Sequence, residues 1–346
     1  MKNSILLIFM VLACVLTSID LAANKYAVYF TDKDNTPYSV DNPLEYLSQR
    51  ALDRRARHGI AITEQDLPVD PAYLQQLVDM GATIKRTSKW LNLAIISCSA
   101  SVADQIEDLD FVTKVEYVAP GSYKGDSKFA DKLKTDNKLY EFTGKEDLNY
   151  GAGYNQINQV NGIPLHQEGY DGEGILVAVI DAGFQNVDGI SGFDRLYDEG
   201  RLVYTENIVN PNVSVYSPST SSHGTNVLSC MAAWLPGQFI GTAPEASYAL
   251  LVTEDSASEY PVECYYWVVG VEVADSLGAD IVSSSLGYQA FDDTSLSFSH
   301  EDMDGVTIAS SIAATIATEK GIFVTVSAGN SNGTSSPWVT TPSDAI

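Results

Sequence analysis

A continuous apolar run, ILVAVI (Ile175–Ile180), is followed directly by Asp181. An apolar run without alternating polar residues is typical of a strand that is covered on both faces of its sheet. Similar short runs alternate with longer helical patterns along the rest of the chain. The expected strands are 247–252, 280–285 and 322–327, and the expected helices begin after His223, at Val262 and after Thr307. This alternation predicts right-handed crossovers and a parallel α/β sheet.

Polar residues and glycines stand where these strands end. Asp181 follows the first strand, Gly287 follows SSSL, and Gly329 and Asn330 follow VTVSA. His223 opens a helix in SSHGTNVLSCMAA. Each of these residues alone is typical of a turn or a helix start. Together they are more informative, because the carboxyl ends of parallel strands meet at one edge of the sheet, where ligands bind. We therefore expect an acid, an imidazole and an amide to converge at one edge.

Residues 24–120 follow a different pattern, in which strand signals enclose helix signals. Asn or Asp before proline is a helix start, and glycine commonly follows a helix end. The expected elements are a strand over 25–30, helices from Asn42-Pro43 to Gly59 and from Asp70-Pro71 to Gly81, strands over 83–86 and 91–97, a helix from about Ser101 and a strand over 115–118. The order predicts a small ferredoxin-like α+β unit with one extra helix.

The helix expected before Gly59 carries a basic cluster of Arg54, Arg55, Arg57 and His58. Such a cluster suits docking onto an acidic partner domain. It is equally compatible with a solvated helix face. The sequence leaves these two interpretations open.

The segments on either side of this unit are of other kinds. Residues 1–23 combine a basic start at Lys2, an apolar run over 5–17 and a cleavage signal at 21–23, which predicts a signal peptide and a secreted protein. Lipidation at Cys14 is the alternative, although the residues after Cys14 stay apolar. Residues 121–150 are polar and charged, and we expect a linker that can be cut.

The net charge of the chain argues against one class of binding partner. It contains 45 acidic and 20 basic residues, and from 151 to 346 we count 24 acidic residues against Arg195, Arg201 and Lys320. So negative a surface repels phosphate backbones, which argues against nucleic acid as a partner. No stretch outside the N-terminal segment is apolar enough to suggest a membrane span. Beyond Cys98, only Cys230 and Cys264 remain, and we expect two small buried thiols, with a disulfide as the alternative.

Five motif stretches follow one another in the second half of the chain: VAVIDAGF, SSHGTNVLSCMAA, GTAPEASYALLVTED, SSSLGY and VTVSAGN. In sequence and order they resemble the subtilisin-like serine peptidases, the subtilases or peptidase S8 family. The resemblance implies a parallel-sheet catalytic domain over 151–346 and an inhibitory, folding-assisting propeptide over 24–120. It also implies a precursor that hydrolyses peptide or protein substrates and has its own propeptide as a partner.

The resemblance assigns roles to three residues. His223 takes the proton of a nucleophilic serine and later returns it to the leaving amine, while Asp181 orients and stabilises the imidazole. Asn330 donates a hydrogen bond to the oxyanion of the tetrahedral intermediate. The implied mechanism is that of an Asp-His-Ser serine endopeptidase.

Substrate contacts and metal ligands follow less directly. The resemblance implies that the substrate backbone pairs with the segment formed by Ser285, Leu286 and Gly287. It also implies that a second segment, which contains Ala328 and Gly329, forms the other wall of the pocket. The sequence establishes no cofactor. Because calcium is common in the family, a structural calcium ion stays an open alternative, and no ligands are assigned to it. An acidic loop is interpreted as solvated, since its spacing matches no calcium loop; its carboxylates are Asp188, Asp194, Asp198 and Glu199.

The tripeptide Gly-Thr-Ser ending at Ser335 resembles the sequence around the family's nucleophile. Ser335, however, is only five residues after Asn330 and is followed by SPWVTTP, where two prolines and β-branched residues disfavour the expected helix. We interpret Ser335 as part of the asparagine loop. The expectation is a chain that ends before the nucleophile and is itself inactive.

Three other functions remain to be compared with the peptidase. One is a degenerate subtilase fold that binds peptides without cutting them. A second is a nucleotide-binding α/β enzyme, against which DAGFQN has the wrong glycine spacing for a phosphate loop. The third is an N-terminal unit that acts alone as a protease inhibitor.

Overall fold

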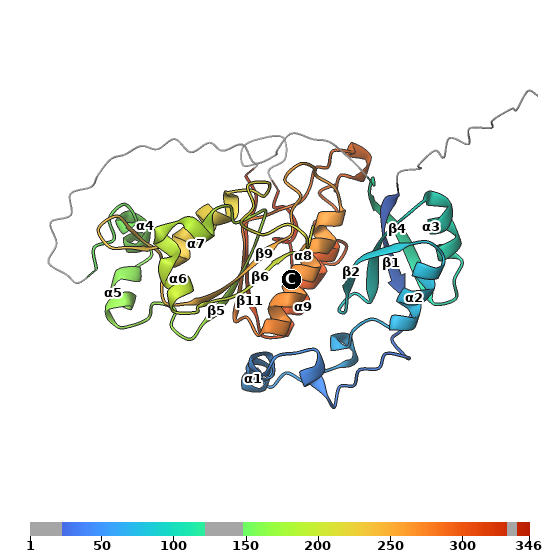
Figure 1. Ribbon diagram of the computed structural model, residues 1–346, viewed down its shortest axis with the longest axis horizontal. Coiled ribbons are helices and arrows are strands. Elements are labelled where there is room, and N and C mark those ends of the chain that lie inside the picture. Colours follow the sequence, from blue (N-terminus) through green and yellow to red (C-terminus); the bar gives the residue numbers. More distant parts are fainter. Residues whose placement is uncertain (1–22, 122–147, 331–337) are drawn as a thin grey trace, which may run out of the picture.

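The computed structural model describes residues 23–121, 148–330 and 338–346, which form two units (Figure 1). We call residues 23–121 the N-terminal unit and the remaining described residues the C-terminal unit. The predicted signal peptide, Cys14, most of the predicted linker and Ser335 lie outside the described residues.

The N-terminal unit contains an antiparallel sheet in the order β2-β3-β1-β4. Its elements are β1 (Asn24–Phe30), α2 (Pro71–Asp79), β2 (Thr83–Ser88), β3 (Leu93–Cys98), α3 (Ala100–Glu107) and β4 (Val112–Ala119). Alternate side chains divide between the faces of the sheet. Val28 and Ile96 pack with Leu77 of α2 and Ile106 of α3, so both helices cover one face, as the ferredoxin-like pattern predicts.

The extra helix begins later than its sequence predicts. A short 3₁₀ turn, Pro43–Glu45, follows Asn42, and the α-helix α1 covers only Gln49–His58. Ser48 caps it, because the Ser48 hydroxyl accepts a hydrogen bond from the Ala51 amide. The predicted end is confirmed, since Gly59 adopts the left-handed conformation with φ 67°.

The C-terminal unit contains a parallel sheet in the order β11-β10-β5-β9-β6. The strands are β5 (Leu176–Asp181), β6 (Leu202–Asn207), β9 (Ser247–Val252), β10 (Ile281–Ser284) and β11 (Phe323–Val326). Four of them were predicted, and the sequence analysis missed β6. As the edge strand, β6 is largely exposed and therefore lacks the apolar run that marks its neighbours.

Helices cover both faces of this sheet. On one side α7 (His223–Ala232) packs against Val177, Val179 and Leu250. On the other side α8 (Val262–Leu277) and α9 (Ala309–Glu319) pack against inward residues such as Ala178 and Leu251. The remaining elements are short: α4 (Tyr154–Gln159), α5 (Gly162–Gln167), α6 (Asp194–Asp198), β7 (Trp234–Leu235), β8 (Phe239–Ile240) and 3₁₀ turns at Glu64–Asp66, Val187–Gly189, Ser191–Phe193 and Thr294–Leu296.

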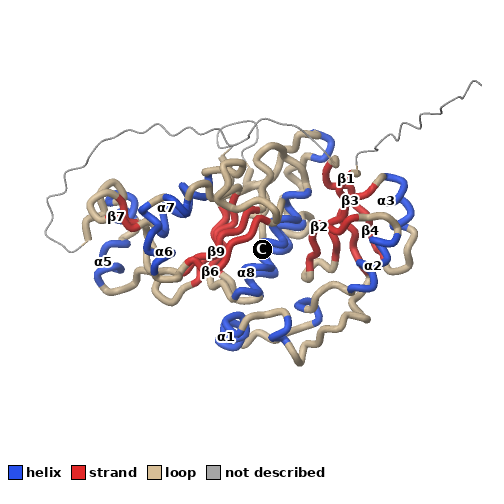
Figure 2. The backbone as a smooth tube through the Cα atoms, viewed as in Figure 1, coloured by secondary structure: helices blue, strands red, loops and turns tan. Residues whose placement is uncertain are grey.

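Helix α8 lies between the two sheets (Figure 2). Ala27 of β1 and Ile95 of β3 belong to the same buried cluster as Trp267 and Val268 of α8. A helix that is buried on nearly all sides needs apolar residues all round, which explains the weak amphipathic pattern of VECYYWVVGVEVADSL. The two units therefore share one hydrophobic core.

The described cysteines form no disulfide. Cys98 and Cys264 are buried, as expected, but Cys230 is exposed on α7, so the prediction of a buried thiol is wrong there. Among the residues that the structure describes, no helix combines the length and apolarity needed to cross a membrane.

Gly270 allows α8 to approach the sheet closely, and we predict that Gly270→Val is destabilising. A Cβ atom there would lie 2.9 Å from Thr253 Cγ2 and 3.4 Å from Ile180 Cδ1. Overpacking of this kind costs about 1–3 kcal/mol, measurable as a loss in the free energy of unfolding in urea. Gly189→Val is the matched control, because nothing lies within 4 Å of its Cβ position. Equal losses in both variants would contradict this account.

Candidate active site

The structure brings Asp181 and His223 into direct contact. Asp181 is the last residue of β5 and His223 is the first of α7. His223 Nδ1 donates a hydrogen bond to Asp181 Oδ1 over 2.7 Å. The Asp181 side chain is fully buried, whereas that of His223 is 36% exposed. An imidazole is thus held at the protein surface by a carboxylate beneath it.

Close packing of α7 on β5 makes this contact possible. A Cβ atom on Gly224 would lie 2.8 Å from Asp181 Cβ and 2.9 Å from Phe184 Cε1. Only glycine fits directly after His223, because a side chain would push the start of the helix away from the carboxylate. The His223 amide is also held, since it donates to Ser221 Oγ over 3.0 Å.

The contact shifts the ionisation of both groups. The hydrogen bond to Asp181 raises the pKa of His223 above its ordinary value, although burial opposes the shift. Burial raises the pKa of Asp181, and the hydrogen bonds from His223 and from the Ala182 amide oppose that change. Because the pKa of His223 is raised in the folded state, its charged imidazole stabilises the folded protein. This stabilisation is fully present below about pH 6.5, the pKa of an unfolded histidine, and is lost as the pH rises through the pKa of His223 in the folded state.

The other predicted segments lie at the same edge of the sheet. The parallel register pairs Ser284 with Ile180 and with Val326, so the residues after β10 and β11 emerge beside Asp181. The Ser327 amide continues this pairing to the Ser284 carbonyl over 3.0 Å. Asn330 is exposed at this edge, as are Ser285, Gly287 and Ala328, while Gly329 is half-buried.

Leu286 is placed differently from its neighbours. Its side chain is only 5% exposed and packs in the core. We predicted that the backbone of this segment pairs with the substrate, and because the buried side chain of Leu286 takes no part in such pairing, this stays a prediction. A segment that continues a strand alternates its side chains between core and surface, which leaves the outward positions, Ser285 and Gly287, at the edge.

Thr340 is a residue that the sequence analysis missed. Added Cβ atoms on Gly287 and on Gly329 would both meet the Thr340 side chain, at 3.1 Å from its Cβ and 3.2 Å from its Cγ2 respectively. Thr340 is buried, and its hydroxyl has no hydrogen-bond partner among the described residues. It therefore lies between the two predicted pocket walls. No motif marked it, because it comes from a later segment that pairs with Tyr288.

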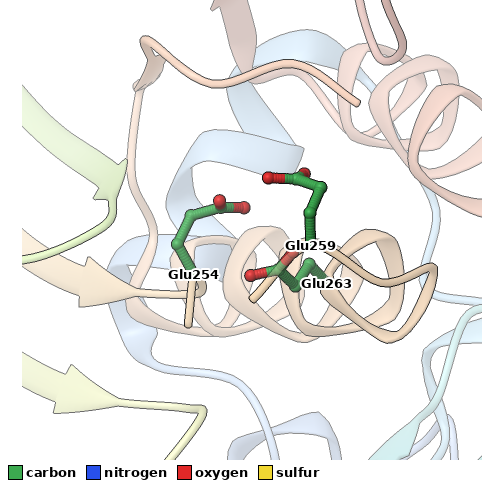
Figure 3. Close-up of side chains that lie close together, drawn as sticks. All are labelled: Glu254, Glu259 and Glu263. Carbon is green, nitrogen blue, oxygen red and sulfur yellow. The ribbon is translucent and has the colours of Figure 1, made fainter. Parts of the chain in front are cut away.

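An acidic group is formed by two residues of the loop after β9 and one residue of the first turn of α8. Carboxylate oxygens of Glu254, Glu259 and Glu263 lie within 4.8 Å of one another, an arrangement that could hold a cation (Figure 3). Glu263 also braces the loop, because Oε1 accepts from the Asp255 amide over 2.7 Å and Oε2 from the Tyr260 amide over 3.3 Å. By contrast, the acidic loop considered from sequence is exposed, and Glu199 pairs with Arg195 and Arg201.

Comparison with protein families agrees with this arrangement. The profile described as the subtilase family matches residues 172–345, half of the chain, and includes Asp181, His223 and Asn330. The chain belongs to the subtilase family. The profile of the peptidase S8 propeptide domain of Bacteroidota matches residues 25–135, so this subtilase is a peptidase precursor with its propeptide region on the N-terminal side.

Individual relatives match over shorter stretches. The subtilase is 34% identical to subtilisin E of Bacillus subtilis (strain 168) over 134 residues, which cover 38% of this chain and 32% of that protein. It is 33% identical to a subtilisin of Bacillus pumilus, covering 38% of this chain and 44% of the relative. The alignments thus span less than half of these relatives. Among solved structures, the epidermin leader peptide processing serine protease of Staphylococcus aureus aligns over 89% of this chain and 60% of its own, with 13% identity and a TM-score of 0.49.

We predict that Asp181→Asn lowers the pKa of His223. The amide carries no charge, and its oxygen is a weaker acceptor for the imidazolium. Proton NMR titration of the four histidines measures the shift, and His58, His166 and His300 serve as internal references. Asp188→Asn is the control variant, because the Asp188 carboxylate is exposed and belongs to the 3₁₀ turn Val187–Gly189. An unchanged His223 titration in Asp181→Asn would rule out the ion pair in solution.

Proposed function

We propose that this subtilase is the precursor of a secreted serine endopeptidase in which Asp181 and His223 activate a serine nucleophile. One observation carries the proposal: a partly exposed imidazole bonded through Nδ1 to a buried carboxylate at the carboxyl edge of a parallel sheet. That bond fixes the tautomer, because a proton on Nδ1 leaves Nε2 free of hydrogen and able to act as a base. Nothing in this arrangement requires a cofactor.

The proton moves twice in the proposed cycle. His223 takes the hydroxyl proton as the serine attacks the carbonyl carbon of the substrate, and then gives it to the departing amine. Asp181 stabilises the imidazolium that exists between the two steps. The raised pKa of His223 supports this role, since it means that the folded chain favours the charged ring.

Two further features complete the proposed site. Asn330 donates to the developing oxyanion, a role supported by its position at the same sheet edge. The substrate backbone runs along Ser285 and Gly287, and the side chain next to the cut bond enters between Gly287 and Gly329, above Thr340. We take Ser335 to have no part in the chemistry and assign the nucleophile to another serine.

Export of the protein is part of the same proposal. It is supported by the sequence of residues 1–23, with its basic start, apolar run and small residues before the expected cleavage site. The surplus of acidic over basic residues suits a soluble exported protein and repels nucleic acid.

The product of the complete open reading frame provides the test. We expect it to hydrolyse peptide substrates and to react with a fluorophosphonate, a reagent for activated serines. Asp181→Asn should reduce kcat by about 10⁴, a loss of the size already established for this class of enzyme. Asn330→Ala should reduce it by about 10²–10³, the magnitude known for subtilisin itself.

Asp188→Asn is the matched control and should leave kcat unchanged within about twofold, because its carboxylate is exposed and belongs to another turn. Absence of both hydrolysis and labelling, together with retained peptide binding, would favour the non-catalytic peptide-binding alternative. Activity that survives Asp181→Asn unchanged would remove this pair from the mechanism.

A further inference from the structure

The side chain of Thr340 fills the space between Gly287 and Gly329. A Cβ atom on Gly287 would lie 2.1 Å from Thr340 Oγ1, and one on Gly329 would lie 3.2 Å from both Oγ1 and Cγ2 of Thr340. The two glycines follow β10 and β11, which are neighbours in the sheet. Thr340 therefore occupies the volume that a side chain on either glycine would need.

Thr340 closes this space on the side of the protein interior. Gly287 is exposed and Gly329 is half-buried, whereas Thr340 is only 7% exposed. Its hydroxyl has no hydrogen-bond partner among the residues that the structure describes. Buried hydroxyls are normally hydrogen-bonded, so this one offers a bond to a group that enters between the glycines. Thr340 thus forms a floor with one methyl group and one hydroxyl.

Backbone hydrogen bonds fix the position of this floor. The Thr340 carbonyl accepts from the Ser343 amide over 2.9 Å, and the Thr341 carbonyl accepts from the Tyr288 amide over 2.9 Å. Tyr288 is the residue after Gly287, so the floor and one glycine wall are joined directly beside the space that they enclose.

A chain of buried hydroxyls ties the same segment to helix α9. Thr341 Oγ1 lies 2.7 Å from Ser310 Oγ and 2.6 Å from Ser311 Oγ, and the Ser311 hydroxyl donates to Asp344 Oδ1 over 2.6 Å. Each hydroxyl has one proton, so Thr341 donates to Ser311 and accepts from Ser310. Asp344 Oδ2 accepts from the Gly305 amide over 3.0 Å. The chain thus ends on a carboxylate, where hydrogen bonds are strongest.

These bonds determine how the floor responds to a large side chain. A group that exceeds the space in a close-packed interior must displace the atoms that it meets. A long or aromatic side chain extends several bonds further than that of alanine or serine and meets Thr340. Because the segment of Thr340 is held by its backbone and by α9, the floor does not recede to make room.

We propose that Thr340 is a specificity-determining residue, which restricts the substrate residue before the cut bond to small side chains such as alanine or serine. Thr341, Ser310, Ser311 and Asp344 are positioning residues that hold the floor in place. The inference rests on the proposed function, because it takes the space between Gly287 and Gly329 as the entry of that side chain. The substrates are therefore proteins or peptides cut after small residues.

The test uses the mature product of the complete open reading frame and two p-nitroanilide peptides that differ only in alanine or phenylalanine before the cut bond. We expect kcat/KM to favour the alanine peptide by about 10², since a single methylene group changes such a ratio by about 10–200-fold. Thr340→Gly should raise kcat/KM for the phenylalanine peptide by about tenfold or more and change that for the alanine peptide by less than about fivefold.

Two further variants separate the floor from its support. Thr341→Val removes only a hydroxyl and should narrow the preference for alanine by about fivefold, because the floor is then less firmly held. An unchanged preference in Thr341→Val would exclude the positioning role. Thr294→Gly is the matched control, because Thr294 is exposed in a 3₁₀ turn, and it should keep the preference within about twofold.

Circular dichroism shows whether the variants fold, and if Thr340→Gly does not, Thr340→Ser, which removes the methyl group, replaces it with an expected gain of about threefold for the phenylalanine peptide. The proposal is overturned if the unaltered enzyme hydrolyses both peptides equally well, or if the folded Thr340 variant keeps the full preference for alanine.

Calorimetric titration with the two cleavage products, which end in alanine or phenylalanine, makes the same comparison without catalysis. The product that ends in alanine should bind the unaltered protein at least about tenfold more tightly and lose this advantage in Thr340→Gly. Equal binding of both products would overturn the proposal. A protein that hydrolyses neither peptide contradicts the proposed function, while the calorimetry still decides the role of Thr340.

Discussion

Parallel pairing around β5 determines where the polar residues of the site lie. The strand is buried on both faces, and its register places Asp181 opposite Val252 of β9 and Ile180 opposite Ser284 of β10. Parallel strands all end at one edge, so residues far apart along the chain meet there without any local signal that links them. The contact between Asp181 and His223 is the result of this constraint, together with the space left by Gly224.

Helix α8 connects that sheet to the N-terminal unit. One side packs on β5 and β9, and the other packs on the sheet formed by β1 and β3. Two of its three buried acids, Glu272 and Asp275, are satisfied by the N-terminal unit. Glu272 accepts from the Ser88 hydroxyl and from the Trp90 amide, and Asp275 accepts from Arg54 and Arg55. Buried carboxylates need such donors, so Glu272 and Asp275 depend on the N-terminal unit for their hydrogen bonds.

Some elements were predictable because their signals are local. The strand Ser247–Val252 and the helix Val262–Leu277 have the predicted bounds, because a continuous apolar run and a terminal glycine mark them. Others depend on neighbours distant in the chain. Asn42-Pro43 looks like a helix start, but Ser48 is the residue that caps α1 where it contacts Ser276. The interpretation of Arg54 and Arg55 as docking residues was left open, and their burial against Asp275 resolves it.

The sequence by itself determined the fold class, the strand ends that carry Asp181 and Asn330, and the likeness to subtilases, because periodicity and short motifs are properties of neighbouring residues. Only the tertiary structure decided the 2.7 Å contact of His223 with Asp181, the place of Thr340 between Gly287 and Gly329, and the core position of Leu286. These depend on the distances between segments that are remote in sequence, and such distances follow from packing rather than from any local pattern.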